Sequence, residues 1–319
     1  MARSMHSHKA ASDAPLGVTG TSSRRSVPIS LLISLRPHQW TKNLLVFAGL
    51  LFAKKLFEPA SVIAAAEAFG IFCALSGVVY LVNDIMDRES DRRHPTKKHR
   101  PIPAGELPVG IAIIAATVLA TGALASAFTL GWQFGAVATA YVSLQSFYSF
   151  TLKHIVILDA LTLSIGFVLR AVAGAVVIGV MISHWLLVCT ILLALFIALA
   201  KRRHELVLLA DGAVSHRPIL GEYSAYLLDQ MIAVVTASTL IAYIFYTISP
   251  ETEQKFGTSW LGLTIPFALY GIFRYLYLVH RREGGGSPAD LLLNDRPLLA
   301  CVTLWVVAVV LIIYHPFKP

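Results

Sequence analysis

Residues 61–82 read SVIAAAEAFGIFCALSGVVYLV, and the chain continues with NDIMDRESD over residues 83–91. In the first stretch only Glu67 is charged, and its length meets the roughly 20 apolar residues needed to cross a bilayer. The second stretch carries three aspartates at regular spacing. Together they predict a transmembrane helix that ends in a carboxylate cluster at the membrane boundary.

The composition of the whole chain favours a membrane protein. Of 319 residues, 56% are hydrophobic and 14% are charged, against about 25% charged in soluble domains. The net charge of +8 suits anionic lipids or phosphorylated substrates, and in a membrane protein we expect no nucleic-acid partner. The three cysteines lie singly in apolar segments, so neither a disulfide framework nor a zinc site is indicated.

Nine segments have the length and apolar content of membrane spans. They lie near residues 36–53, 61–82, 107–129, 132–150, 155–180, 184–200, 229–249, 258–279 and 297–315. We therefore expect an all-α membrane bundle of nine transmembrane helices. Residues 1–27, rich in Ser, Ala, Gly and Thr, are expected to form a disordered tail, and residues 28–319 a single intramembrane domain.

Basic residues gather in alternate connections between these segments, which the positive-inside rule assigns to the cytoplasm. They are Arg92, Arg93, Lys97, Lys98, Arg100, Lys153, Lys201, Arg202, Arg203, Arg217, Arg281, Arg282 and Arg296. This pattern predicts a multi-pass protein of the inner (plasma) membrane with a cytoplasmic N-terminus. It leaves the oligomeric state open, a homo-oligomer included.

The acidic stretch is the strongest chemical signal. On a continuous helix Asp84, Asp87 and Asp91 fall within an arc of about 60°, where their charges repel one another. A bound Mg²⁺ would remove this repulsion and bridge the carboxylates to a substrate phosphate. Asn83 is expected to act as a further ligand of the predicted metal site or to orient its ligands. The alternative is a solvated helix end that neighbouring arginines neutralise.

Cations at the same membrane boundary are candidates for phosphate binding. Lys42 lies about 9 Å inside the first span and should face a cavity, unless its side chain snorkels to the interface. Two further span ends are polar, with Tyr148 and Lys153 in one and Lys201, Arg202 and Glu205 in the other. Topology charges and a Lys201–Glu205 pair are the competing explanation. We interpret Arg170, deep in the fifth span, as a structural residue that pairs with Asp159 or Glu67.

These motifs resemble those of the UbiA superfamily of intramembrane prenyltransferases, over about residues 30–315. The match rests on the NDxxDxxxD pattern at residues 83–91, on Arg100-Pro101 and on the nine-span layout. More narrowly, five segments resemble the decaprenyl-phosphate phosphoribosyltransferase branch. These segments are residues 36–43 (RPHQWTKN), 80–84 (YLVND), 91–97 (DRRHPTK), 152–154 (LKH) and 201–206 (KRRHEL).

The resemblance implies transfer of 5-phosphoribose from phosphoribosyl pyrophosphate to a polyprenyl phosphate, with Mg²⁺ held by Asp84, Asp87 and Asp91. It also favours Arg92, Lys97 and Arg100 as the substrate-binding residues of the basic loop. Aromatic prenyltransferases carry a second aspartate-rich motif where this chain has Lys201-Arg202-Arg203-His204-Glu205, which favours a donor with more phosphates. The alternatives are a prenyltransferase that uses a prenyl diphosphate, and a transporter of an anionic lipid.

Overall fold

The computed structural model describes residues 25–209, 218–281 and 288–314. Most of the expected N-terminal tail, and the loop residues Arg217 and Arg282, lie outside these ranges. Within them all regular structure is helical, which confirms the all-α class. The α-helices are α1 Val27–Ser34, α2 Ala48–Phe52, α3 Pro59–Met86, α4 Arg88–Arg93, α5 Val109–Thr129, α6 Trp132–Phe150, α7 Leu158–Val177, α8 His184–Leu209, α10 Ala225–Ile248, α11 Pro250–Phe256, α12 Ile265–Arg281, α13 Pro288–Asn294 and α14 Arg296–Tyr314. The 3₁₀ helices are η1 Pro37–Phe47, η2 Lys97–His99, η3 Leu152–His154, η5 Pro218–Glu222 and η6 Trp260–Thr264.

The expected count of nine transmembrane helices is wrong for the described residues. Seven helices are long and apolar enough to cross a membrane, and they correspond to α3, α5, α7, α8, α10, η6 with α12, and α14. The expected first span is instead broken into η1 and α2. The expected fourth span is α6, a helix of 19 residues that includes Gln133 and Gln145. Polar side chains lower the hydropathy of both segments, and two of them, Asn43 in η1 and Gln145 in α6, are buried inside the bundle.

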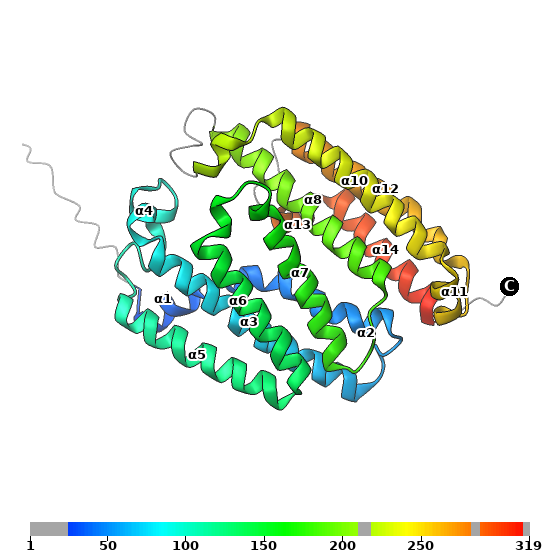
Figure 1. The fold of residues 1–319 in the computed structure, drawn as a ribbon, viewed down its shortest axis with the longest axis horizontal. Coiled ribbons are helices and arrows are strands. Elements are labelled where there is room, and N and C mark those ends of the chain that lie inside the picture. Colours follow the sequence, from blue (N-terminus) through cyan, green and yellow to red (C-terminus); the bar gives the residue numbers. More distant parts are fainter. Residues whose placement is uncertain (1–24, 210–217, 282–287, 315–319) are drawn as a thin grey trace, which may run out of the picture.

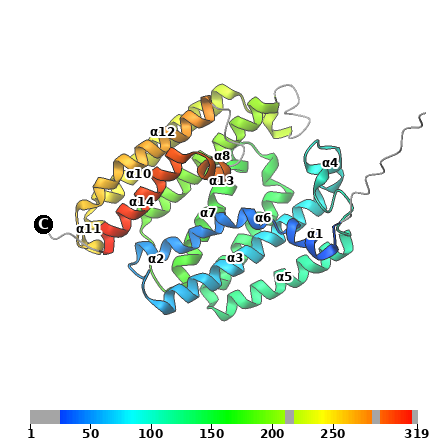
Figure 2. The same ribbon diagram turned by 180° about the vertical axis from the view of Figure 1, so that it is seen from behind.

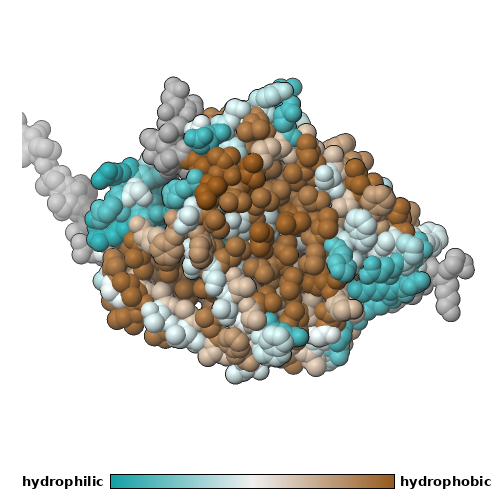
Figure 3. Space-filling model, in the orientation of Figure 1, coloured by the Kyte–Doolittle hydropathy of each residue, from teal (hydrophilic) through white to brown (hydrophobic). Residues whose placement is uncertain are grey.

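The helices form two groups joined by α7. Figures 1 and 2 show α3, α5 and α6 on one side of α7 and α8, α10, α12 and α14 on the other. The first group packs around Phe72, Phe134 and Tyr141, and the second around Phe196, Leu199 and Leu228. One face of the molecule is largely apolar. Figure 3 shows a broad hydrophobic face between one hydrophilic patch around α4 and another around α11.

Close backbone packing holds η1 in place against α7. A methyl group added at Gly174 would lie 1.8 Å from the Val46 carbonyl oxygen, and one added at Gly49 would lie 3.1 Å from the Gly174 carbonyl oxygen. Small residues at facing positions allow such an approach between membrane helices. Because η1 carries Lys42 and Asn43, this contact also sets the position of both side chains.

We expect Gly174→Ala to lower the melting temperature of the purified protein and to reduce its activity, because the added methyl group must push η1 away. Overpacking of this kind costs about 1–3 kcal/mol. Gly122→Ala on α5 is the matched control, since an added methyl group there meets no atom within 4 Å. Equal melting temperatures for the two variants would contradict this account of the η1–α7 contact.

Candidate active site

The acidic stretch does not form one continuous helix. Helix α3 ends at Met86, Asp87 is the capping residue with ψ of 7°, and α4 begins at Arg88. The expectation that all three aspartates share one helical face is therefore wrong. Asp84 and Asp91 face a common set of cations, whereas Asp87 faces another element. The break separates like charges that would otherwise repel each other along one face.

Asp84 and Asp91 are bridged by a single arginine. The Arg100 Nη1 atom donates to Asp84 Oδ1 at 3.1 Å and to Asp91 Oδ2 at 2.6 Å. Arg36 donates to the same Asp84 oxygen at 2.5 Å, and the Lys97 ammonium lies 3.9 Å from Asp91 Oδ1. Asp84 is only 1% exposed and Asp91 only 2%. Two buried carboxylates are thus neutralised by three cations, which come from the residue before η1, from η2 and from the loop after η2.

The other members of the acidic stretch point elsewhere. Asp87 accepts a hydrogen bond at 3.0 Å from Lys153 in η3, which connects α6 to α7. Glu89 is exposed and pairs with Arg92 at 3.1 Å. Arg92 also donates to the Pro103 carbonyl oxygen and, unlike Lys97 and Arg100, pairs with neither Asp84 nor Asp91. These contacts give no support to the expectation that Arg92 binds substrate. The half-buried Asn83 immediately precedes Asp84 on α3.

The donor set at Asp84 and Asp91 fits a divalent cation. Among the described residues no three carboxylate, imidazole or thiolate side chains converge into a ready-made metal site. Two carboxylates do converge, and the Arg100 nitrogen between them shows that their oxygens can share one cation. Mg²⁺ is commonly held by one or two carboxylates together with substrate phosphates and water. This pair meets that requirement without a third aspartate.

A second polar network lies deeper in the bundle and positions η1. Arg170 on α7 is buried, and it donates to Asn43 Oδ1 and to the Tyr141 hydroxyl, both at 2.7 Å. Asn43 donates in turn to Ser76 on α3 at 3.2 Å. The expected pairing of Arg170 with Asp159 or Glu67 is therefore wrong.

Lys42, next to Asn43, is half-buried and forms no ion pair with any described residue.

The third cluster surrounds Arg202, which is 1% exposed. Its guanidinium donates to Asp159 at 2.6 Å, to Glu205 at 3.0 Å and to the Tyr148 hydroxyl at 3.4 Å. Lys201 lies 3.9 Å from Glu205 and is more exposed. In the sequence, Arg202 is one of several basic residues at a span end, which topology alone could explain. The structure buries it between α6, α7 and α8 because Asp159 supplies a buried counter-charge.

Tyr223 completes this third cluster. Its hydroxyl donates to Asp159 Oδ1 at 2.8 Å and accepts from the Ile157 backbone nitrogen at 2.7 Å. Burial raises the pKa of Tyr223 to about 12, so the hydroxyl remains protonated at neutral pH and continues to donate to Asp159. Both oxygens of Asp159 are then bonded, one to Tyr223 and one to Arg202.

Sequence reasoning missed three contributors to these clusters. Arg36 belongs to the RPHQWTKN segment at residues 36–43. Its position in the sequence gave no indication of a contact with Asp84, which is 48 residues away. Its left-handed backbone, with φ of 53°, is an uncommon conformation for a residue other than glycine and often marks a functional position. Asp159 and Tyr223 were also missed as partners of Arg202. A buried acid near a span end was the available signal for Asp159.

Comparisons with known proteins agree on one family. The model of the UbiA prenyltransferase family matches residues 43–293. A Corynebacterium glutamicum protein named decaprenyl-phosphate phosphoribosyltransferase is 34% identical over 289 residues, which cover 89% of this chain and 86% of that protein. A Mycobacterium tuberculosis protein of the same name is 34% identical over 283 residues, which cover 86% of this chain and 91% of that protein.

Solved structures support the same fold. A UbiA homolog from Archaeoglobus fulgidus, bound to GPP and Mg²⁺, superimposes with a TM-score of 0.71 at 18% identity, covering 88% of this chain and 99% of that one. The same homolog has been solved with Cd²⁺, at a TM-score of 0.65. With its apolar spanning helices, this chain is an integral membrane protein, and it belongs to the UbiA prenyltransferase family.

Proposed function

We propose that this protein transfers 5-phosphoribose from phosphoribosyl pyrophosphate to a polyprenyl phosphate, such as decaprenyl phosphate, and releases pyrophosphate. The relatives named decaprenyl-phosphate phosphoribosyltransferase in Corynebacterium glutamicum and Mycobacterium tuberculosis match most of the chain. The observation that carries the proposal is the excess of cations at one polar end of the bundle. Four of these cations, Arg36, Lys97, Arg100 and Lys153, pair with Asp84, Asp87 and Asp91. The fifth is Lys42, which is half-buried next to Asn43 on η1.

This excess matches the charge of the proposed substrates. The donor carries a pyrophosphate and a 5-phosphate, and the acceptor carries a lipid phosphate, so three anionic groups must approach one another. A site in which carboxylates outnumbered cations would repel them. Here Arg36, Arg100 and Lys97 neutralise Asp84 and Asp91, and these cations can shift to substrate phosphates when a divalent cation takes over the carboxylates.

The reaction needs positioning and charge stabilisation more than a strong base. The bond between the anomeric carbon of ribose and the pyrophosphate oxygen breaks, and a bond from that carbon to a lipid phosphate oxygen forms. The attacking phosphate is already ionised at neutral pH. Asp84 and Asp91, with Asn83 as a further proposed ligand, would hold Mg²⁺, which would supply stabilisation of the charge on the departing pyrophosphate. Asp87 pairs with Lys153 and would have to release it to become a further ligand. Lys42, Lys97 and Arg100 stabilise the same charge by direct contact.

The Arg202 cluster is proposed to hold the second phosphate region. Lys201 is the exposed cation of this cluster, and Lys153 lies at the adjoining end of α6 beside Asp87. Arg202 fixes Tyr148 and Glu205 by direct hydrogen bonds. We assign Lys153, Lys201 and Tyr148 to the 5-phosphate or the lipid phosphate, with Arg202 and Glu205 setting their positions. The polar end that carries both clusters would face the cytoplasm of the plasma membrane, in agreement with its basic loops.

The two arginines of the basic loop provide a matched comparison. Arg100→Met should raise the KM for phosphoribosyl pyrophosphate and lower kcat/KM by about tenfold to a hundredfold, because it removes a charged hydrogen-bond donor from the site. Arg92→Met should leave both parameters nearly unchanged, since Arg92 pairs with the exposed Glu89. Steady-state kinetics on both variants measures the difference. An equal loss of kcat/KM in the two variants would contradict both assignments: that Arg100 binds the substrate and that Arg92 does not.

The main rival is prenyl transfer, which the family's name and the GPP-bound neighbour favour. We would incubate the purified protein and Mg²⁺ with phosphoribosyl pyrophosphate and decaprenyl phosphate, and separately with a prenyl diphosphate and an aromatic acceptor. Pyrophosphate release only in the first mixture supports phosphoribosyl transfer. Pyrophosphate release only in the second mixture overturns the proposal. It would also mean that the Lys201–Glu205 segment has a structural role and does not bind a substrate phosphate.

A further inference from the structure

Lys42 and Arg170 are two cations inside the bundle that pair with no carboxylate of the described residues. Arg170 is 5% exposed, and it donates to the Asn43 side chain, the Gly166 carbonyl oxygen and the Tyr141 hydroxyl. All three acceptors are neutral. The Tyr141 ring also lies 4.8 Å from the guanidinium, a contact that is attractive but does not cancel a unit charge.

Other arginines that link helices have an acid as counter-charge. Arg202 pairs with Asp159 at 2.6 Å, and Arg274 pairs with Asp295 at 2.8 Å. A buried charge without such a partner is unfavourable, because the interior does not replace the water that it loses. We therefore expect the negative charge that Arg170 lacks to come from a ligand.

The Lys42 ammonium is the part of this pair that a ligand can reach. Lys42 is half-buried, and its Nζ atom is not among the polar atoms that the protein seals without a partner. The positive charges of Arg170 and Arg36 repel it, so one anion beside Lys42 is attracted by all three cations. Arg36 also donates to Asp84, which joins this group of cations to the proposed metal site.

One face of α3 connects these cations with the metal site. Ser76, Tyr80 and Asp84 are spaced by four residues, so they lie along one side of the helix. Asn43 donates to Ser76 at 3.2 Å. Arg36 lies over the Tyr80 ring, 4.7 Å from its centroid, and donates to Asp84. An anion that is bound to a metal ion at Asp84 can therefore extend along this polar face toward η1.

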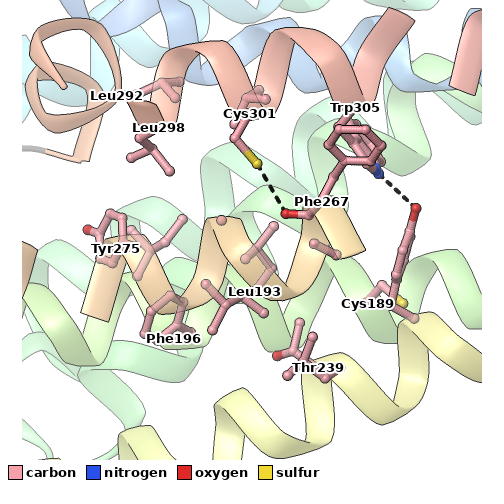
Figure 4. Close-up of a pocket in the computed structure, with 17 residues that line it drawn as sticks. Cys189, Leu193, Phe196, Thr239, Phe267, Tyr275, Leu292, Leu298, Cys301 and Trp305 are labelled. Carbon is pink, nitrogen blue, oxygen red and sulfur yellow. Dashed lines mark hydrogen bonds between the residues drawn. The ribbon is translucent and has the colours of Figure 1, made fainter. Parts of the chain in front are cut away.

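The apolar cavity between α8, α10, α12 and α14, with a volume of about 350 Å³, shows no comparable sign of an anionic ligand. None of the described residues that line it is charged. Figure 4 shows two of its polar groups paired within the protein, with Cys301 bonded to the Phe267 carbonyl oxygen and Trp305 to the Tyr243 hydroxyl. The cations without a counter-charge are thus a feature of the bundle around Lys42.

We propose that Lys42 contacts a diphosphate and that Arg170 supplies a second positive charge that attracts it. Arg170 acts through its charge without touching the ligand, because each of its three nitrogens already donates to a protein oxygen. This inference rests on the part of the proposed function in which pyrophosphate leaves beside Lys42. It does not depend on the transferred group, because phosphoribosyl pyrophosphate and a prenyl diphosphate share the diphosphate.

Calorimetric titration of the full-length protein with inorganic pyrophosphate and Mg²⁺ tests this proposal. Arg170→Gln removes the charge and keeps an amide donor, and it should raise the dissociation constant by about tenfold. Arg170→Lys keeps the charge and should bind within about threefold of the wild type. Arg274→Gln is the matched control. It makes the same change at an arginine that Asp295 neutralises, and it should bind pyrophosphate as the wild type does.

Tyr141→Phe removes one hydrogen bond of Arg170 and keeps its charge. It should also bind within about threefold of the wild type, and it provides a test if Arg170→Gln does not fold. Equal weakening in Arg170→Gln and Arg170→Lys, or a tenfold weakening in Tyr141→Phe, would overturn the proposal, because Arg170 would then act through its hydrogen bonds. Absence of pyrophosphate binding in the wild type would overturn it as well.

The two proposals can fail separately. If pyrophosphate binding depends on the Arg170 charge as expected, while the wild type forms no ribosylated lipid, phosphoribosyl transfer alone is refuted. If the lipid forms and Arg170→Gln binds pyrophosphate as tightly as the wild type, the role of Arg170 alone is refuted.

Discussion

Asp84→Asn should lower Mg²⁺-dependent turnover by at least about a hundredfold while the protein remains folded. Asp84 is buried and receives hydrogen bonds from Arg36 and Arg100. The amide keeps an acceptor oxygen for these arginines but loses the charge that a divalent cation needs. The measurement is the initial rate of product formation over a range of Mg²⁺ concentrations, with the melting temperature recorded in parallel.

Glu89→Gln is the control for this substitution, because it makes the same chemical change on the same stretch of chain. Glu89 is exposed and pairs only with Arg92 among the described residues, and surface pairs contribute little. Its activity should match that of the wild type. An Asp84→Asn variant that keeps most of its activity, with an unchanged Mg²⁺ dependence, would refute the assignment of Asp84 to the metal.

The largest effect on stability is expected for Arg202→Met. The substitution removes the guanidinium that donates to the buried Asp159 at 2.6 Å, and breaking a buried ion pair costs about 3–5 kcal/mol. The melting temperature should fall by about 10 °C. Lys201→Met is the matched control, since Lys201 is more exposed and its pairing with Glu205 is loose. It should lose activity with little change in melting temperature.

A double variant separates charge burial from packing. In Asp159→Leu/Arg202→Met both charges are gone, and replacement of a buried ion pair by apolar residues is often nearly neutral. The double variant should therefore recover most of the stability that Arg202→Met loses. If Arg202→Met and the double variant both melt at the wild-type temperature, Arg202 does not stabilise this cluster. A direct role of Arg202 in phosphate binding would then gain support.

The helical class and the polar end of the bundle were predictable, because long apolar segments and basic loops follow directly from the cost of placing charge in a bilayer. The number of membrane spans was not predictable from the sequence. Residues 36–53 have suitable length, but Pro37 and the polar side chains that follow support a 3₁₀ helix, and this helix depends on packing against Gly174. Such a contact between distant segments leaves no mark in local hydropathy.

The candidate site likewise has features that could be predicted from the sequence and features that could not. The aspartates and Arg100 were evident from spacing and from family resemblance, and the structure places Asp84, Asp91 and Arg100 together. Which cation faces which carboxylate could not be predicted, because it depends on where helices end. Asp87 turns toward Lys153 only because α3 stops one residue earlier. Burial of Arg202 likewise depends on Asp159, which is 43 residues away.

The most direct test of the account is transfer of radiolabelled ribose from phosphoribosyl pyrophosphate to decaprenyl phosphate by the purified protein, with Mg²⁺ and with EDTA. We predict a labelled lipid that forms with Mg²⁺, is absent with EDTA and is lost in Asp84→Asn but not in Glu89→Gln. Absence of labelled lipid under every condition, with the protein folded and a prenyl diphosphate consumed instead, would contradict phosphoribosyl transfer.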